Sequence, residues 1–86
     1  IAVTTITFKL YAGLSQYLPA NAVRNSVKIE LDGDETVDRF IQRHKVPEAD
    51  VHLVLVNGRY LDASERMIQT LKAGDTLAIW PPVAGG

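Results

Sequence analysis

The sequence predicts an α+β fold in which a mixed sheet packs against one main helix. Three observations carry this prediction: stretches where apolar and polar residues alternate, one amphipathic stretch with helical spacing, and one tight-turn dipeptide between apolar runs. The 86 residues suffice for one hydrophobic core, and no cysteine is present to supply a disulfide or a thiolate metal ligand. We therefore expect a single small domain that is stabilised by its core.

The N-terminal third predicts two strands and a short helix. Apolar residues alternate with polar ones over residues 3–11 and again over residues 26–31, which is typical of half-buried strands. Between them, residues 12–18 place apolar side chains at helical spacing before Pro19, which predicts a short helix of about two turns. The side chains expected to face the core are Ile6, Phe8, Leu10, Leu14, Tyr17, Leu18, Val27, Ile29 and Leu31.

The main helix is predicted over residues 37–45. Its apolar face consists of Val37, Phe40, Ile41 and His44. Thr36 fits the N-cap position, Asp38 lies near the positive end of the helix dipole, and Pro47 closes the segment. The preceding acidic run at 32–35 superficially resembles a calcium loop. It lacks the later ligands and the closing Glu, so we interpret it as a solvated turn.

The C-terminal half contains the clearest turn signal. Asn57-Gly58 suits a type I′ turn and predicts a hairpin over residues 51–61 with a short second arm. Residues 62–71 are irregular, with room for one helical turn, and residues 76–80 predict a last strand with Leu77 and Ile79 inward. The side chains of the irregular segment that are expected to fill the core are Met67, Ile68 and Leu71.

This order of elements predicts the β-grasp, or ubiquitin-like, fold. We expect four to five strands, with the first and last side by side at the centre of the sheet, packed against one main helix plus a short helix. Residues 1–80 would form the domain, and residues 81–86 a flexible C-terminal Gly-Gly tail.

One helix can cover only one face of such a sheet, so the side chains of the other face indicate whether it has a partner. Ala78 and Trp80 point away from the inward residues of the last strand, and one of the pairs Leu53/Leu55 and Val54/Val56 must also point away. Trp80, the only tryptophan, either folds over the sheet edge or under the 62–71 segment, or forms an apolar patch for a protein partner.

Charge and hydropathy argue against several classes of partner. Nine basic and ten acidic residues give a net charge of −1, so no nucleic acid and no anionic membrane is expected as a partner. The longest apolar run, residues 53–56, is too short to span a bilayer, and the N-terminal residues do not resemble a secretory signal. We therefore expect a cytoplasmic protein.

The side chains alone do not describe an enzyme, and no metal or cofactor site is expected. His44 and His52 lie on different elements, and no serine follows a nucleophile-elbow pattern. The remaining reactive group is the carboxylate at Gly86. Pro81-Pro82 favour a stiff, extended exit, and the small residues that follow let a partner's channel close around the backbone. The predicted tail residues for such a channel are Pro81, Pro82, Val83, Ala84 and Gly85.

The stretches "FKLYAGLSQYLP", "VNGRYL" and "LKAGDTLAIWPPVAGG" resemble the sulfur carrier proteins, which include the thiamine-pathway carrier and the small subunit of molybdopterin synthase. The Pro-Pro before Gly-Gly is closest to the latter. "ANAVRNS" gives no useful match, and "ASERMIQT" is more polar than the family pattern under the sheet.

This resemblance implies a non-catalytic carrier subunit of a sulfurtransferase complex. Gly86 would be adenylated by an enzyme related to ubiquitin-activating enzymes, which uses ATP, and then converted to a thiocarboxylate. The sulfur would pass to the large subunit of molybdopterin synthase, with Trp80 and Ala78 facing partners. The alternatives are a ubiquitin-like modifier that is joined to lysines, a carrier for thiamine, cysteine or tungsten cofactor synthesis, and a plain binding module.

Overall fold

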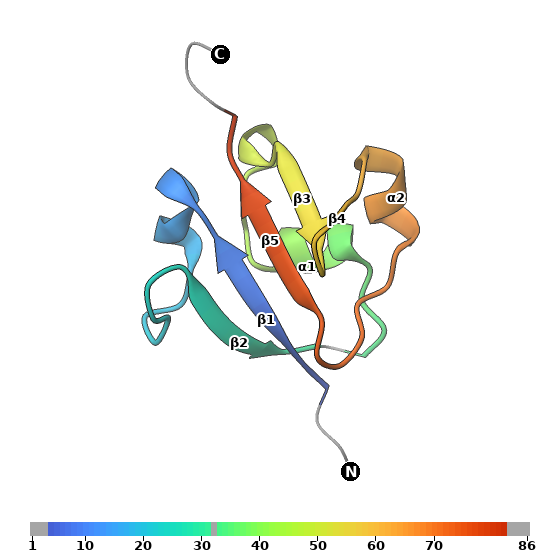
Figure 1. Cartoon of the computed structure of the whole chain (residues 1–86), viewed down its shortest axis with the longest axis horizontal. Helices are drawn as coiled ribbons and strands as arrows, with labels where there is room; N and C mark the ends of the chain where they lie inside the picture. The colour runs from blue at the N-terminus through green and yellow to red at the C-terminus, as the bar shows by residue number, and fades with distance from the viewer. Residues whose placement is uncertain (1–3, 32, 83–86) are drawn as a thin grey trace.

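The computed structural model describes residues 4–31 and 33–82, in which a twisted sheet has its main helix on one face (Figure 1). The elements are β1 (Thr5–Leu10), η1 (Ala12–Tyr17), β2 (Ser26–Glu30), α1 (Val37–Arg43), η2 (Glu48–Asp50), β3 (Leu53–Val56), β4 (Arg59–Tyr60), α2 (Ala63–Ile68) and β5 (Thr76–Trp80). The strand order is β2-β1-β5-β3-β4. β1 and β5 are parallel, and the other pairings are antiparallel, which confirms the predicted mixed sheet with the first and last strands adjacent.

The predicted alternation in the strands is confirmed by burial. In β1 the residues Ile6, Phe8 and Leu10 are buried, and the residues between them are half-exposed. Leu77 and Ile79 of β5 are fully buried as well. The core formed by these side chains also contains Leu14, Val27, Val37, Phe40, Ile41, Val46, Val54, Val56, Leu61 and Leu71.

The short helix predicted before Pro19 is a 3-10 helix, η1, rather than an α-helix. Leu14 is its buried residue, and Tyr17 and Leu18 pack partly against the core. A 3-10 helix is the usual form of such a short connector.

α1 begins at the predicted N-cap and ends earlier than predicted. Thr36 Oγ1 accepts a hydrogen bond from the Arg39 amide at 3.2 Å. The helix ends at Arg43 because Lys45 has a left-handed backbone with φ of 59°, which an α-helix cannot include. On the core side, the rings of Phe8 and Phe40 meet edge to face with centroids 5.0 Å apart, which ties β1 to α1.

The prediction that the acidic run 32–35 is a solvated turn is wrong for Glu35. Its side chain is buried, and its two oxygens accept hydrogen bonds from Nε and Nη2 of Arg43 at 2.8 and 2.7 Å. A bidentate guanidinium compensates the charge of a buried carboxylate. Arg43 is the last residue of α1, and its side chain reaches back to Glu35, which precedes the helix. Asp34 is exposed, and Asp32 lies outside the described residues.

The Asn57-Gly58 turn is confirmed. Both residues have positive φ angles, 53° and 82°, as a type I′ turn requires. β4 is short, as predicted, and it lies at the edge of the sheet.

The prediction for residues 62–71 is confirmed only in part. Where one helical turn was expected, the structure has the short helix α2 (Ala63–Ile68), which begins with a capping box between Asp62 and Glu65. Met67 and Ile68 do not fill the core, because their side chains are 66% and 78% exposed. Leu71 is buried as expected. Leu61, just before α2, is also buried and fills the core in place of Met67 and Ile68. Figure 1 shows α2 to the side of β3 and β4, away from the middle of the sheet, so its apolar residues need not point into the core.

Candidate functional site

The candidate site is the end of β5, where the chain leaves the sheet. The Tyr11 amide donates a hydrogen bond to the Ile79 carbonyl, and the His52 amide donates one to the Trp80 carbonyl, both at 3.1 Å. Pro81 follows and has no amide hydrogen, so strand pairing stops there. Pro81 is half-buried and Pro82 is exposed. The predicted site residues Val83, Ala84, Gly85 and Gly86 lie outside the described residues.

Trp80 lies on the face of the sheet opposite α1. Its neighbours Leu77 and Ile79 are fully buried on the helix side, and its ring stacks on Tyr11 with centroids 4.4 Å apart and 4° between the planes. Because β1 and β5 are parallel, both strands finish at the same end of the sheet, which brings the two rings together. Tyr11, rather than the 62–71 segment, is therefore the residue that partly covers Trp80.

The open face of the sheet is apolar on the side of β3. We call this set of residues the open-face patch: Leu53, Leu55, Tyr60, Ala78 and Trp80. Residues that are opposite one another in neighbouring strands project from the same face. Trp80 is opposite Leu53, Ala78 is opposite Leu55, and Leu55 is opposite Tyr60. Of the two pairs that the sequence left open, Leu53/Leu55 faces outward and Val54/Val56 faces the core.

The two predicted interface residues differ in accessibility. Trp80 is half-exposed, whereas Ala78 is only 7% exposed between Lys9 on β1 and Leu55 on β3. Tyr60 is 51% exposed and offers more surface than either, although its position two residues after the hairpin turn did not single it out in the sequence. On the far side of β5 the open face becomes polar, where Thr7 of β1 is opposite Lys28 of β2.

The two histidines are not brought together. His44 is half-buried and packs against Phe40 and Phe8 of the core, with ring centroids 4.4 and 5.5 Å away, whereas His52 is exposed beside the end of β5. Burial lowers the pKa of His44, the nearby Arg43 lowers it further, and Glu35 partly offsets these effects. The neutral form of His44 is thus favoured, and its ring serves as a packing residue.

The capping group of α2 accounts for another polar cluster. Asp62 accepts hydrogen bonds from the Glu65 amide at 2.8 Å and from the Ser64 hydroxyl at 2.7 Å. These bonds lower the pKa of Asp62, the Glu65 amide first, because they stabilise the carboxylate form. Ser64 is therefore part of a helix cap. No group of three or more metal-ligating side chains is present among residues 4–31 and 33–82.

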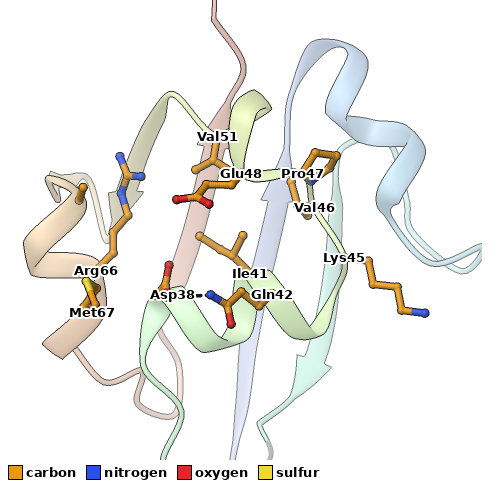
Figure 2. A pocket seen from close by; sticks show the side chains of 11 residues that line it. Asp38, Ile41, Gln42, Lys45, Val46, Pro47, Glu48, Val51, Arg66 and Met67 are labelled. Carbon is orange, nitrogen blue, oxygen red and sulfur yellow. Dashed lines mark hydrogen bonds between the residues drawn. The ribbon is translucent and has the colours of Figure 1, made fainter.

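A second surface feature is a cleft of about 570 Å³ on the helix side of the sheet. Figure 2 shows Ile41 of α1 and Val51 after η2 in it, with Glu48 and Arg66 nearby and Asp38 hydrogen-bonded to Gln42. Its charged residues balance, with Asp38 and Glu48 against Lys45 and Arg66. The cleft lies on the opposite face of the sheet from Trp80.

Of the helices that the structure describes, none has the length and apolar content needed to cross a membrane.

Comparison with known proteins identifies the family. A family model described as Mut7-C ubiquitin matches residues 3–85. The chain belongs to the Mut7-C ubiquitin family. A search of curated proteins gives no significant match. This Mut7-C ubiquitin domain is similar to small archaeal modifier protein 1 of Haloferax volcanii, with 28% identity over 95% of this chain and 99% of that one and a TM-score of 0.60.

Two further solved structures share the fold of this Mut7-C ubiquitin domain. A Pyrococcus furiosus protein named for molybdopterin converting factor subunit 1 has 24% identity, coverage of 93% of this chain and 99% of that chain, and a TM-score of 0.64. Small archaeal modifier protein 1 of Methanosarcina acetivorans has 21% identity, coverage of 99% of both chains, and a TM-score of 0.65. The β-grasp fold predicted from the sequence is thereby confirmed.

Proposed function

We propose that this domain is a carrier whose reactive group is the carboxylate of Gly86, which a partner enzyme activates with ATP. The observation that carries the proposal is the end of β5: a fully paired central strand runs directly into Pro81-Pro82 beside the half-exposed Trp80. The proposal requires that Gly86 is the last residue of the mature protein. Glycine at that position leaves its carbonyl carbon unhindered.

The proposed chemistry begins with activation, because a carboxylate is a poor electrophile. A Gly86 carboxylate oxygen attacks the α-phosphorus of ATP and pyrophosphate leaves, which gives an acyl-adenylate. Hydrosulfide from a sulfur donor then attacks the acyl carbon, AMP leaves, and a terminal thiocarboxylate remains. The adenylating enzyme supplies the catalytic groups, and this domain presents the carboxylate.

The open-face patch supports docking of such partners. Leu53 and Leu55 are partly exposed and Tyr60 is 51% exposed. Leu53 is opposite Trp80, the residue from which the tail starts, and Leu55 and Tyr60 continue the patch away from it. Apolar and aromatic side chains of this kind are the common anchors of protein interfaces. We propose that the adenylating enzyme binds this patch and that the large subunit of molybdopterin synthase is the acceptor of the sulfur.

A second fate for the adenylate has support of its own. The 28% identity to small archaeal modifier protein 1 of Haloferax volcanii extends over nearly the whole chain. In this alternative a lysine amine of a target protein attacks the activated Gly86 carbon, and an amide bond forms. Both fates share the activation step, and they differ in the nucleophile.

ATP–pyrophosphate exchange tests the shared step. The full chain, incubated with a ubiquitin-activating-type adenylating enzyme of the same organism, should support exchange, and a variant that lacks Gly86 should not. The variant should keep the wild-type unfolding curve, since the strands, helices and core described above lie within residues 5–80. Exchange by the shortened variant, or none by the wild type, would contradict the proposal.

The two fates leave different peptides after trypsin digestion. Lys72 is the last basic residue of the chain, so conjugation would leave residues 73–86 as a branch on target lysines. A sulfur carrier alone would leave a linear peptide that ends in a thiocarboxylate.

A further inference from the structure

Three contacts hold the last residues of β5 at the point where pairing stops. The amide of Tyr11, just after β1, donates to the Ile79 carbonyl, and the amide of His52, just before β3, donates to the Trp80 carbonyl. The Tyr11 ring also lies flat on the Trp80 ring. Parallel ring planes at 4° and centroids at 4.4 Å allow close contact over a wide area. Trp80 is therefore fixed in both its backbone and its side chain.

The backbone of Tyr11 is itself held in place by η1, the 3-10 helix that follows it. Its carbonyl accepts a hydrogen bond from the Leu14 amide at 3.1 Å, and the Leu14 side chain is 2% exposed in the core. The backbone turns sharply at Ala12, where φ is 52°. η1 thus anchors the stacking residue to the core, and the stack is more than a contact between two free side chains.

The direction in which the chain leaves the sheet follows from this anchoring. Pro81 and Pro82 fix their own φ angles, so a rotation at Trp80 is passed on along the chain. Pro81 and Pro82 together span at most about 7 Å, and a 10° error at Trp80 moves the end of this pair by about 1.2 Å. Reacting groups tolerate an error of only about 0.5 Å, so the orientation of Trp80 matters for where the rest of the tail begins.

We propose that Tyr11 and His52 form a clamp on Trp80 that sets the direction of Pro81-Pro82, with Tyr11 as a positioning residue for activation at Gly86. This inference rests on the proposed function. The open-face patch binds the partner, and the clamp sets the direction of Pro81-Pro82 once the partner is bound. Loss of the clamp therefore lowers kcat, whereas loss of a patch residue raises KM.

The test compares Tyr11→Ala with Tyr60→Ala, which removes an equally large ring from the patch without touching the stack. The first readout is the time-resolved fluorescence anisotropy of Trp80, the only tryptophan of the chain. Wild type and Tyr60→Ala should show the slow decay of overall tumbling, and Tyr11→Ala should add a fast component. Tyr11→Phe keeps a ring of the same size and should restore the slow decay.

The second readout is the kinetics of ATP–pyrophosphate exchange. Tyr11→Ala should lower kcat by about two- to tenfold with little change in KM, because an aromatic pair is lost. Tyr60→Ala should raise KM with little change in kcat. A wild-type kcat for Tyr11→Ala, with or without a change in anisotropy, overturns the positioning role. If the wild type itself supports no exchange while the anisotropies still differ as expected, the proposed function fails and the positioning role with it, although the clamp on Trp80 stands.

Discussion

The His44 side chain makes the stability of the domain depend on pH. The ring packs between Phe8 and Phe40, and its buried Nε2 atom has no hydrogen-bond partner among the described residues. Burial lowers the pKa of His44 below its ordinary value of about 6.5, and Arg43 adds to this effect. Protonation in the folded state would place a partly desolvated cation beside the Arg43 guanidinium, which Glu35 offsets only in part.

The sign of the dependence follows from proton binding. Below pH 6.5 the unfolded chain protonates His44 more readily than the folded protein does, so the free energy of unfolding should fall as pH decreases from about 7.5 to 5.5. Urea unfolding over this range measures the effect. His44→Gln should flatten the dependence and His52→Gln should preserve it, because His52 is exposed. An unchanged slope in His44→Gln would contradict the assignment.

Single residues were the hardest to place from the sequence. The burial of Glu35 depends on Arg43 eight positions later, and the 3.6-residue period identifies the apolar face of α1 but not which polar pairs are buried with it. The exposure of Met67 and Ile68 depends on where α2 sits relative to the sheet, and hydrophobicity alone does not give that position. Tyr11 was missed because it stands at the end of the predicted strand 3–11, and its stack on Trp80 depends on the register of β1 against β5, which alternation does not give.

At the scale of elements, the β3–β4 turn stabilises more than the hairpin it closes. The Asn57 amide side chain accepts from the Thr76 amide and donates to Asp75, both at 2.9 Å, so it connects the turn to the start of β5. Asn57 also adopts φ of 53°, a conformation that Asn tolerates better than most residues.

Substitutions at Asn57 separate the contribution of its side-chain hydrogen bonds from that of its left-handed backbone. Asn57→Ala should lower the free energy of unfolding by about 1–3 kcal/mol, since it loses both hydrogen bonds and strains the left-handed backbone. Asn57→Gly loses the bonds without the strain and should fall between Ala and the wild type. Chemical denaturation of the three proteins measures this order, and a wild-type midpoint for Asn57→Ala would be inconsistent with it.

Elements with strong local signals were predicted well. Alternation located β1, β2 and β5, the Asn57-Gly58 turn located β3 and β4, and the capping residue Thr36 located the start of α1. α2 was described only as one helical turn, although Asp62 and Glu65 have the spacing of a capping box and could have revealed it. The end of α1 was misplaced because a left-handed Lys45 has no signal in the sequence.

At the scale of the whole molecule, the strand topology places the residues of the candidate site at one end of the sheet. The parallel pairing of β1 and β5 places Tyr11 beside Trp80, and the antiparallel pairing of β3 places Leu53 there as well. The sequence predicted this adjacency of strands, the open face and the exit of the chain. It could not predict which pair of β3 faces outward, because the run at 53–56 is apolar throughout.

The proposed function requires that the Gly86 carboxylate is activated and takes up sulfur. The most direct test is the intact mass of the full chain after incubation with the adenylating enzyme, ATP and sulfide. Exchange of one carboxylate oxygen for sulfur should add about 16 Da to the wild type and nothing to the variant that lacks Gly86. An unchanged wild-type mass, in a reaction where the enzyme activates a known substrate, would contradict the claim.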